Sequence, residues 1–219
     1  SENLIEKAYL VGFRLGDLNV MKSVNVIRVR CSTTHKAQLK LIKELFSTYT
    51  TPHHWIAKRG TIEIVCLVNH SFNFLLPKKD GIPNWITNKK RYFFSFLAGY
   101  SDAEGCFHLH TPKTEGAVST AIFEIQTQDR NIICDAASML QKFSIIVSGP
   151  SISRGANTID NRGVRNNKDV WKFSIARKES LWKFIHYIGP YMKHEEKTKK
   201  LQKFKENLIE RNYLPHCKP

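Results

Sequence analysis

The chain has 219 residues, of which 42% are hydrophobic and 11% aromatic, so it is able to bury a core and wholesale disorder is excluded. Lysine and arginine number 34 against 19 aspartates and glutamates, and the formal net charge of +15 at pH 7 favours a polyanionic partner such as nucleic acid. The longest apolar stretch, around residues 92–100, is too short to span a bilayer, and the five scattered cysteines contain no CxxC pair that would indicate a zinc ribbon.

The N-terminal residues show no secretory signal, because Glu2, Glu6 and Lys7 interrupt any apolar region. We therefore expect an intracellular protein with reduced cysteines, in the cytoplasm of a prokaryote or in an organelle matrix. No contact with a membrane is expected.

The first half of the chain starts with an apolar helical run that ends on a carboxylate. Residues 10–18 read LVGFRLGDL, with Gly12 and Gly16 four positions apart and Asp17 directly after them. Hydrophobic periodicity then predicts an extended run over 24–32, a helix over 36–49, a hairpin of 55–57 and 61–68, and a short helix over 71–76. A breaker-rich stretch, 77–83, separates the halves, and we divide the chain into an N-terminal repeat (1–80), a linker (81–87) and a C-terminal repeat (88–219).

The second half repeats this order. A helix over 88–103 contains LAGYSDAEG, in which Gly99 and Ala103 are four apart and Glu104 follows. The pattern then predicts strands over 106–110 and 118–127, a helix over 129–143, a hairpin of 145–151 and 170–176, and two amphipathic helices up to the C-terminus. The unit helix–strand–strand–helix–strand–strand–helix therefore occurs twice.

The small residues in the two motif helices predict that these helices pack on each other. Residues four apart share a helical face, and glycine or alanine there lets two backbones approach closely. Asp17 and Glu104 would then lie side by side, where two carboxylates repel unless a divalent cation binds between them. The alternative is that both are structural acids at helix C-termini, where each opposes the helix dipole by about 0.3–1 kcal/mol.

The two motifs resemble those of the single-chain LAGLIDADG homing endonucleases, and the resemblance extends from about Lys7 to Arg211. LAGYSDAEG matches the family motif strongly and LVGFRLGDL moderately, with Leu18 where the family usually has glycine. The resemblance implies an α/β (α+β) fold of two pseudo-symmetric αββαββα repeats, packed through their motif helices into a saddle of two antiparallel sheets. It also implies a monomer that hydrolyses both strands of a long, nearly asymmetric DNA site with Mg²⁺ and leaves short 3′ overhangs.

The resemblance further implies that Mn²⁺ or Ca²⁺ substitutes for Mg²⁺ in binding. No protein-splicing signature stands at either end of the chain, so we expect a free-standing, intron-encoded enzyme rather than an intein. Asp17 and Glu104 are the expected catalytic pair, and the family pattern adds the backbone carbonyls of Gly16 and Ala103 as metal ligands. Asp102 is expected to point away from Glu104, and to cap a helix or contact solvent.

Residues that position the attacking water come, in the family, from strand ends and from the segments before the terminal helices. This implies Gln128 and Thr34 at strand ends, with Gln126 as a further choice. It also implies Lys89, Lys193 and Lys197 from the later segments. For each lysine, a solvated helix face is the competing interpretation.

The predicted strands offer one apolar face and one polar face. Ile27, Val29 and Cys31 alternate with polar side chains, as do Phe123 and Ile125 in the second half. Such faces also occur without a ligand, but arginine, lysine, glutamine, serine and threonine are the side chains that read base edges or hold phosphate. The DNA-binding residues predicted from these strands and from the polar loop 153–168 are Arg28, Arg30, Ser32, Thr34, Thr120, Glu124, Gln126, Lys172, Ser174, Arg154, Arg162 and Arg165.

Two other classes of function compete with a nuclease. One is a nucleic-acid-binding module on the same scaffold, either an intron RNA maturase or a transcription regulator without cleavage. The other is an interaction protein whose halves merely associate. Both motif acids are kept, which favours cleavage, and the net charge argues against the interaction protein.

Overall fold

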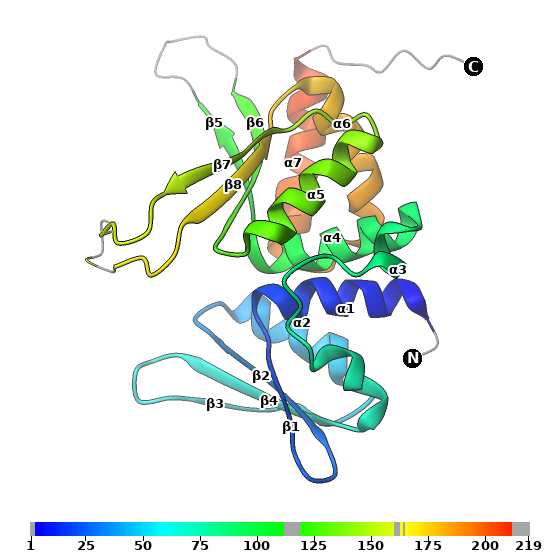
Figure 1. The fold of residues 1–219 in the computed structure, drawn as a ribbon, viewed down its shortest axis with the longest axis vertical. Helices are drawn as coiled ribbons and strands as arrows, with labels where there is room; N and C mark the ends of the chain where they lie inside the picture. The colour runs from blue at the N-terminus through cyan, green and yellow to red at the C-terminus, as the bar shows by residue number, and fades with distance from the viewer. Residues whose placement is uncertain (1–2, 112–118, 160–162, 164, 212–219) are drawn as a thin grey trace.

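The structure, a computed structural model, describes residues 3–111, 119–159, 163 and 165–211 (Figure 1). The N-terminal half contains α1 (Leu4–Gly16), β1 (Asn19–Lys22), β2 (Ile27–Thr33), α2 (Lys36–Phe46), β3 (His53–Ile56), β4 (Ile62–Val68) and the 3-10 helix η1 (His70–Leu75). The C-terminal half contains α3 (Asn84–Thr87), α4 (Lys90–Glu104), β5 (Gly105–His110), β6 (Thr120–Thr127), α5 (Arg130–Lys142), β7 (Ser148–Arg154), β8 (Val170–Ile175), α6 (Lys178–Ile188), the 3-10 helix η2 (Gly189–Tyr191) and α7 (Glu195–Glu210).

Each half has one four-stranded antiparallel sheet, and the strand order is the same in both. The orders are β1-β2-β4-β3 and β5-β6-β8-β7, so the two sheets are topological copies of each other. This confirms the predicted α+β fold with two pseudo-symmetric repeats.

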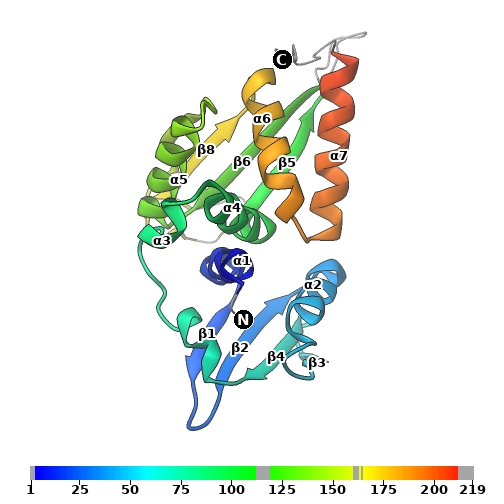
Figure 2. The ribbon, with the colours of Figure 1, turned by 90° about the vertical axis from the view of Figure 1, so that its right-hand side faces the viewer.

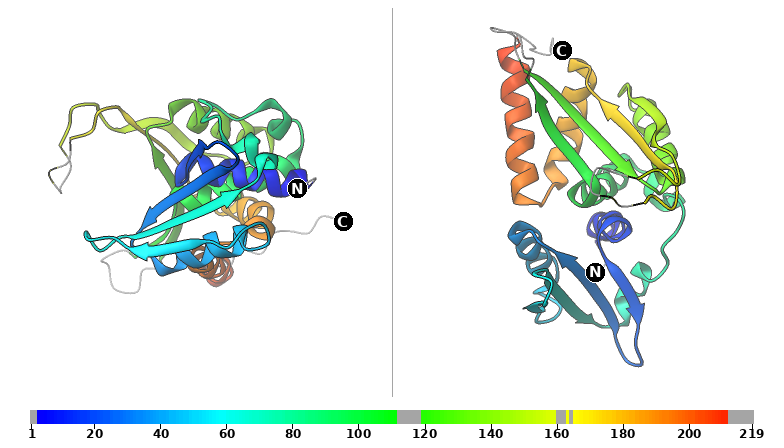
Figure 3. Two further views of the ribbon diagram at one scale, coloured as in Figure 1. Left: turned by 90° about the horizontal axis from the view of Figure 1, so that it is seen from below. Right: turned by 90° about the vertical axis from the view of Figure 1, so that its left-hand side faces the viewer.

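Helices cover one side of the sheets and leave the other side open. In Figure 2, α5, α6 and α7 lie in front of β5, β6 and β8, and α2 lies in front of β2 and β4. The right-hand view of Figure 3 shows the opposite side, where the strands of both sheets are uncovered. The open faces therefore point to the same side of the molecule and form the predicted saddle.

The two halves pack through α1 and α4 at backbone distance. A Cβ added to Gly12 would lie 2.0 Å from the carbonyl oxygen of Phe96, and one added to Gly99 would lie 2.0 Å from that of Tyr9. Helix α4 is buried on all sides from Tyr92 to Asp102, as expected for a helix at the centre of a core. The small residues of the two motifs thus permit the helix contact that the sequence predicts.

Several predicted bounds differ from the structure, and one strand was missed. The extended run over 24–32 starts too early, because residues 23–26 form a turn in which the Ser23 N–H donates to the Val26 carbonyl and Val24 is 88% exposed. Strand β1 was missed: Asn and Lys have low strand propensity, and its pairing with β2 decides its conformation. The predicted helix over 88–103 begins at Lys90, and the predicted linker contains the short helix α3. The division of the chain at 80 and 88 stays a prediction.

No helix in the described part of the chain is long and apolar enough to cross a membrane.

Candidate functional site

The C-terminal ends of α1 and α4 bring Asp17 and Glu104 to one place. Gly16 makes this possible, because a Cβ built on it would lie 2.3 Å from the Ala103 Cβ and 3.4 Å from the Glu104 Oε1. The two carboxylates interact electrostatically, because the charge of Asp17 is among the causes that raise the pKa of Glu104. Two acids at helix C-termini are unfavourable for the helix dipoles, so the fold accepts an electrostatic cost here.

Burial is the main reason why both carboxyl groups hold their protons more tightly than usual. It raises the pKa of Glu104, together with the charge of Asp17, from 4.5 to about 6. Burial also raises the pKa of Asp17, while the charge of Lys197 and a hydrogen bond from Gln38 act in the opposite direction. In that hydrogen bond, Gln38 Nε2 on α2 donates to Asp17 Oδ2 at 2.7 Å.

Lys197 lies at this site, as the sequence predicts, but its ammonium group contacts the backbone. Its Nζ donates to the carbonyls of Ser101 at 2.8 Å, Asp102 at 2.8 Å and Ala103 at 3.0 Å. These carbonyls lie in the last turn of α4, at its negative dipole end; that of Ser101 also accepts the N–H of Gly105. The predicted metal ligand Ala103 O therefore already accepts one hydrogen bond. Burial lowers the pKa of Lys197, although the charges of Asp102, Asp17 and Glu104 favour its charged form.

Asp102 caps the start of α7 and does not contact solvent. Its side chain is 1% exposed and its Oδ2 accepts hydrogen bonds from the N–H groups of Lys193 at 2.8 Å and His194 at 3.1 Å. The Tyr9 hydroxyl on α1 donates to the same oxygen at 2.6 Å. Because Lys197 is in the first turn of α7, Asp102 fixes the place from which Lys197 reaches α4. Of the two predicted roles for Asp102, capping is confirmed.

Leu18, which follows Asp17, is accommodated without a glycine. Its side chain is 3% exposed in the core, and its carbonyl accepts a hydrogen bond from Arg14 Nη1 at 2.5 Å. At the equivalent position, Gly105 is held closely, since an added Cβ would lie 2.7 Å from the Ser101 carbonyl. A leucine in place of the motif glycine thus fits after Asp17, whereas the close contact at Gly105 leaves no room for a side chain.

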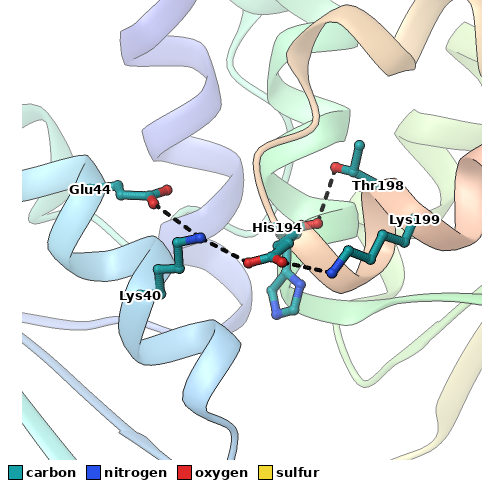
Figure 4. A network of polar contacts seen from close by, with 6 residues as sticks. Lys40, Glu44, His194, Thr198 and Lys199 are labelled. Atoms are coloured by element: carbon teal, nitrogen blue, oxygen red, sulfur yellow. Dashed lines mark hydrogen bonds and ion pairs between the residues drawn. The ribbon is translucent and has the colours of Figure 1, made fainter.

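A cavity of about 290 Å³ opens beside Asp17 and is lined by both halves of the chain. An ion pair bridges α2 and α7 nearby, with Lys40 Nζ 2.9 Å from Glu195 Oε2 (Figure 4). Within α7, Lys199 Nζ lies 2.7 Å from Glu195 Oε1. Hydrogen bonds from these two lysines lower the pKa of Glu195 to about 2. Because the pairs are exposed, they contribute little to stability. The cavity is lined by Asp17, Cys31, Ser32, Thr33, His35, Gln38, Asp102, Ala103, His194, Glu196, Lys197 and Lys200.

A sequence model described as LAGLIDADG endonuclease matches residues 97–208, which is half of the chain. The chain belongs to this family. Comparison with curated proteins gives no match.

Solved structures share the LAGLIDADG fold with this chain at low sequence identity. The homing endonuclease I-WcaI bound to its DNA recognition sequence is 20% identical, with a TM-score of 0.58 over 91% of this chain and 86% of its own. The meganuclease I-AabMI bound to uncleaved DNA is 13% identical, with a TM-score of 0.56 over 93% and 90%. Full-length DUF199/WhiA from Thermatoga maritima is 15% identical, with a TM-score of 0.58 over 99% of this chain and 63% of its own.

Of the other residues predicted from the LAGLIDADG pattern, Lys89 is not beside the two carboxylates. Lys89 precedes the first residue of α4, about 22 Å along the helix from Glu104, so its expected place in the site is corrected. The Lys193 Nζ lies 4.9 Å from the centre of the Tyr9 ring. Gln128 and Thr34 are exposed just after β6 and β2, Gln128 directly before Asp129 and Thr34 between two residues that line the cavity, and Gln126 Nε2 donates to Glu124. The resemblance assigned these residues by their place in the repeat, and apart from Lys89 their role at the site stays a prediction.

Three residues near the carboxylates were missed by the sequence analysis. Gln38 donates a hydrogen bond to Asp17. The charge of Asp129 raises the pKa of Glu104, and the charge of Lys78 lowers it. Lys78 Nζ and Asp129 Oδ2 are 3.9 Å apart. None of the three belongs to a motif. The signal that the sequence offered was the position of Asp129 at the start of the predicted helix 129–143.

The open sheet faces carry most of the predicted DNA-binding residues. On β2, Arg28, Arg30 and Ser32 are exposed, while Ile27 and Val29 are buried. On the second sheet, Glu124 is neutralised, with Lys172 Nζ at 3.6 Å from its Oε2. Thr120 and Ser174 are half-buried, Arg154 and Arg165 are exposed, and Arg162 lies outside the described residues.

The donor set at the LAGLIDADG helix ends fits a divalent cation. Carboxylate oxygens are the ligands that Mg²⁺ prefers. Burial raises the pKa of both carboxyl groups and the charge of Asp17 adds to it for Glu104, and a bound cation would offset both effects. Among the described residues, no group of three His, Cys, Asp or Glu side chains is close enough to hold a metal alone. Oxygen atoms of the backbone, of water or of a bound phosphate would have to complete the coordination.

The raised pKa of Glu104 predicts a pH dependence of stability in metal-free protein. Its folded-state pKa of about 6 exceeds the ordinary 4.5, so folding gains stability from the protonated group, and this gain is lost as the pH rises through 6. With a chelator present, we expect the melting temperature to fall between pH 5 and 7 more in the natural chain than in Glu104→Gln. Calorimetry at half-unit pH steps measures both, and equal slopes would contradict the prediction.

Lys197→Met should weaken the site more than it weakens the fold. It leaves three carbonyls without their charged donor, at a cost of about 1–3 kcal/mol of unfolding free energy, and it removes the positive charge near the carboxylates. We expect DNA cleavage to slow by about 10–100-fold. Single-turnover cleavage and urea unfolding measure the two effects. Lys199→Met, on the exposed side of the same helix, is the control. It should change the cleavage rate by less than a factor of two and leave the free energy of unfolding unchanged.

Proposed function

We propose that the protein is a site-specific endonuclease that hydrolyses both strands of a long DNA target with a divalent metal ion. One observation carries the proposal: Asp17 and Glu104 lie together, half-buried, where α1 and α4 end between two open sheet faces. The endonuclease family supports it, as do the fold neighbours whose structures contain DNA. The net charge of +15 supports a polyanionic substrate.

The metal would be held by Asp17 and Glu104, with the carbonyls of Gly16 and Ala103 as further oxygen donors. When bound, Mg²⁺ would neutralise the charge that develops on phosphate and lower the pKa of a water molecule. Gln38 holds one oxygen of Asp17 and so orients the carboxylate. Lys197 supplies a fixed positive charge on the α4 side, and Lys78 supplies one beyond Glu104.

The open sheet faces would bind the DNA on either side of the carboxylates. Arg28 and Arg30 on β2 are exposed and suited to phosphate or guanine. Arg154 and Arg165 extend the basic surface on the second half. Thr120, Gln126, Lys172 and Ser174 line the corresponding face of the second sheet, and Glu124 would read cytosine only if Lys172 is released from it.

Several finer features belong to this proposal. The protein would act as a monomer, since one chain supplies both motif helices. Cleavage would leave short 3′ overhangs, Mn²⁺ or Ca²⁺ would replace Mg²⁺ in binding, and the enzyme would be intron-encoded and act inside a prokaryotic cell or an organelle.

A second candidate function is binding of nucleic acid without cleavage, as in a maturase or a transcription regulator. The contact of Lys197 Nζ with the Ala103 carbonyl favours it, because an ammonium group then occupies an oxygen that the family pattern assigns to metal. The same fold also occurs in DUF199/WhiA, which is not described as an endonuclease.

A cleavage selection from a randomised double-stranded DNA library in Mg²⁺ distinguishes the two. Recovery of one long preferred site, cut by the natural chain and not by its carboxylate variants, is the expected result. Enrichment of a site by binding, with no cutting in Mg²⁺ or Mn²⁺, would overturn the nuclease and leave the binding module.

A further inference from the structure

A cavity of about 520 Å³ lies at the far end of α4 from Glu104. Its wall comes from the start of α4, the end of α6 and η2, so it belongs to the C-terminal half. The length of α4 separates it from the carboxylates by about 20 Å. Figure 2 shows α4 and α6 on the helical side of the molecule, opposite the open sheet faces. The cavity is lined by Lys89, Lys90, Arg91, Phe94, His186, Tyr187, Pro190 and Tyr191.

Three consecutive cations stand at the rim without a carboxylate to neutralise them. Lys89, Lys90 and Arg91 are exposed, and no aspartate or glutamate lines the cavity. None of the ion pairs between described side chains involves the three residues. They also surround the N-terminal end of α4, where no acidic residue stands in the first turn and the helix dipole is positive.

Aromatic rings form the wall behind these cations. Lys90 Nζ lies 3.3 Å from the centre of the Tyr187 ring, and the Phe94 and Tyr187 rings are 5.0 Å apart. Because the Lys90 ammonium covers the Tyr187 ring, the rings that offer faces to a ligand are the exposed His186 and the partly exposed Tyr191. The cavity thus combines unneutralised positive charge with open aromatic surface in one concave place.

We propose that this cavity binds single-stranded nucleic acid, separately from the duplex site. Cations that track a phosphate backbone and rings on which bases stack are the two elements of such sites. A duplex keeps its bases stacked inside, so only an unpaired base is able to enter the cavity. The proposal goes beyond the proposed nuclease function, because the two surfaces lie on opposite sides of the molecule and engage different forms of nucleic acid.

Fluorescence anisotropy with labelled RNA and DNA single strands of about 12 nucleotides tests the proposal at fixed salt. In the double variant Lys90→Ser, Arg91→Ser we expect the dissociation constant to rise at least ten-fold. In Tyr191→Leu, which keeps an apolar side chain but removes the ring, we expect a rise of at least about five-fold. The matched control, Lys203→Ser with Lys205→Ser, removes the same charge from α7 and should change the constant less than two-fold.

The outcomes separate the sources of binding. Tighter binding of RNA than of DNA would identify the 2′-hydroxyl as part of the ligand, whereas equal binding assigns recognition to phosphate and base; either supports the site. Unchanged binding in the Lys90 and Arg91 variant, with its melting temperature preserved, would overturn it. Inorganic polyphosphate that competes as well as the oligonucleotides would overturn the stacking of bases. Duplex cleavage by these variants should equal that of the natural chain, so the nuclease proposal is tested independently.

Discussion

Asp17→Asn and Glu104→Gln should each abolish DNA cleavage while leaving DNA binding within a factor of about three. Each change keeps the shape of the side chain but removes a charge that a divalent cation needs, and no third carboxylate, histidine or cysteine among the described residues completes a metal site. We expect the single-turnover rate to fall at least about 10³-fold, equivalent to about 4 kcal/mol of transition-state stabilisation.

Cleavage of the selected target in Mg²⁺, with binding measured in Ca²⁺, gives both quantities. Glu210→Gln, an exposed acid at the end of α7, is the matched control and should cleave normally. The metal-free Glu104→Gln variant should also melt at a higher temperature than the natural chain at pH 7.5, because it lacks a buried charge beside Asp17. Full cleavage by either carboxylate variant would show that the catalytic pair is wrongly assigned.

Gly12→Ala and Gly99→Ala should each prevent the two halves from packing. The added methyl carbon would lie 2.0 Å from a backbone carbonyl oxygen of the facing helix, and backbone atoms cannot move away as a flexible side chain can. Overpacking of a core costs about 1–3 kcal/mol where side chains adjust, so we expect more than about 3 kcal/mol of destabilisation here.

Urea unfolding followed by circular dichroism measures this loss. Gly155→Ala is the control, because its nearest neighbour to the new Cβ would be Thr158 Cγ2 at 3.9 Å, an ordinary contact. That variant should be neutral or slightly more stable, by about 0.4–1 kcal/mol. A stable, fully folded Gly12→Ala protein would contradict the close helix contact on which the site depends.

The repeat, the helix contact and the pair of motif acids were predictable from the sequence alone. Small residues four apart, each set followed by an acid, are local patterns, and a helix presents such residues on one face wherever it packs. The alternation of β2 was predictable for the same reason, since Ile27, Val29 and Cys31 must share a face. Strand β1 was not, because its conformation comes from pairing with β2 and not from its own residues.

Only the tertiary structure decided which polar groups surround the carboxylates. Lys197 reaches α4 because Asp102 accepts the N–H groups at the start of α7, a contact between residues about 90 positions apart. Gln38 reaches Asp17 because α2 packs on β2 and β4 and against α7, and no feature of its own helix marks it. Lys89 and Lys197 look alike in the sequence, yet one lies at the far end of α4 and the other at the site. Local periodicity determines which face a residue occupies, whereas its neighbours across the fold depend on how the elements pack.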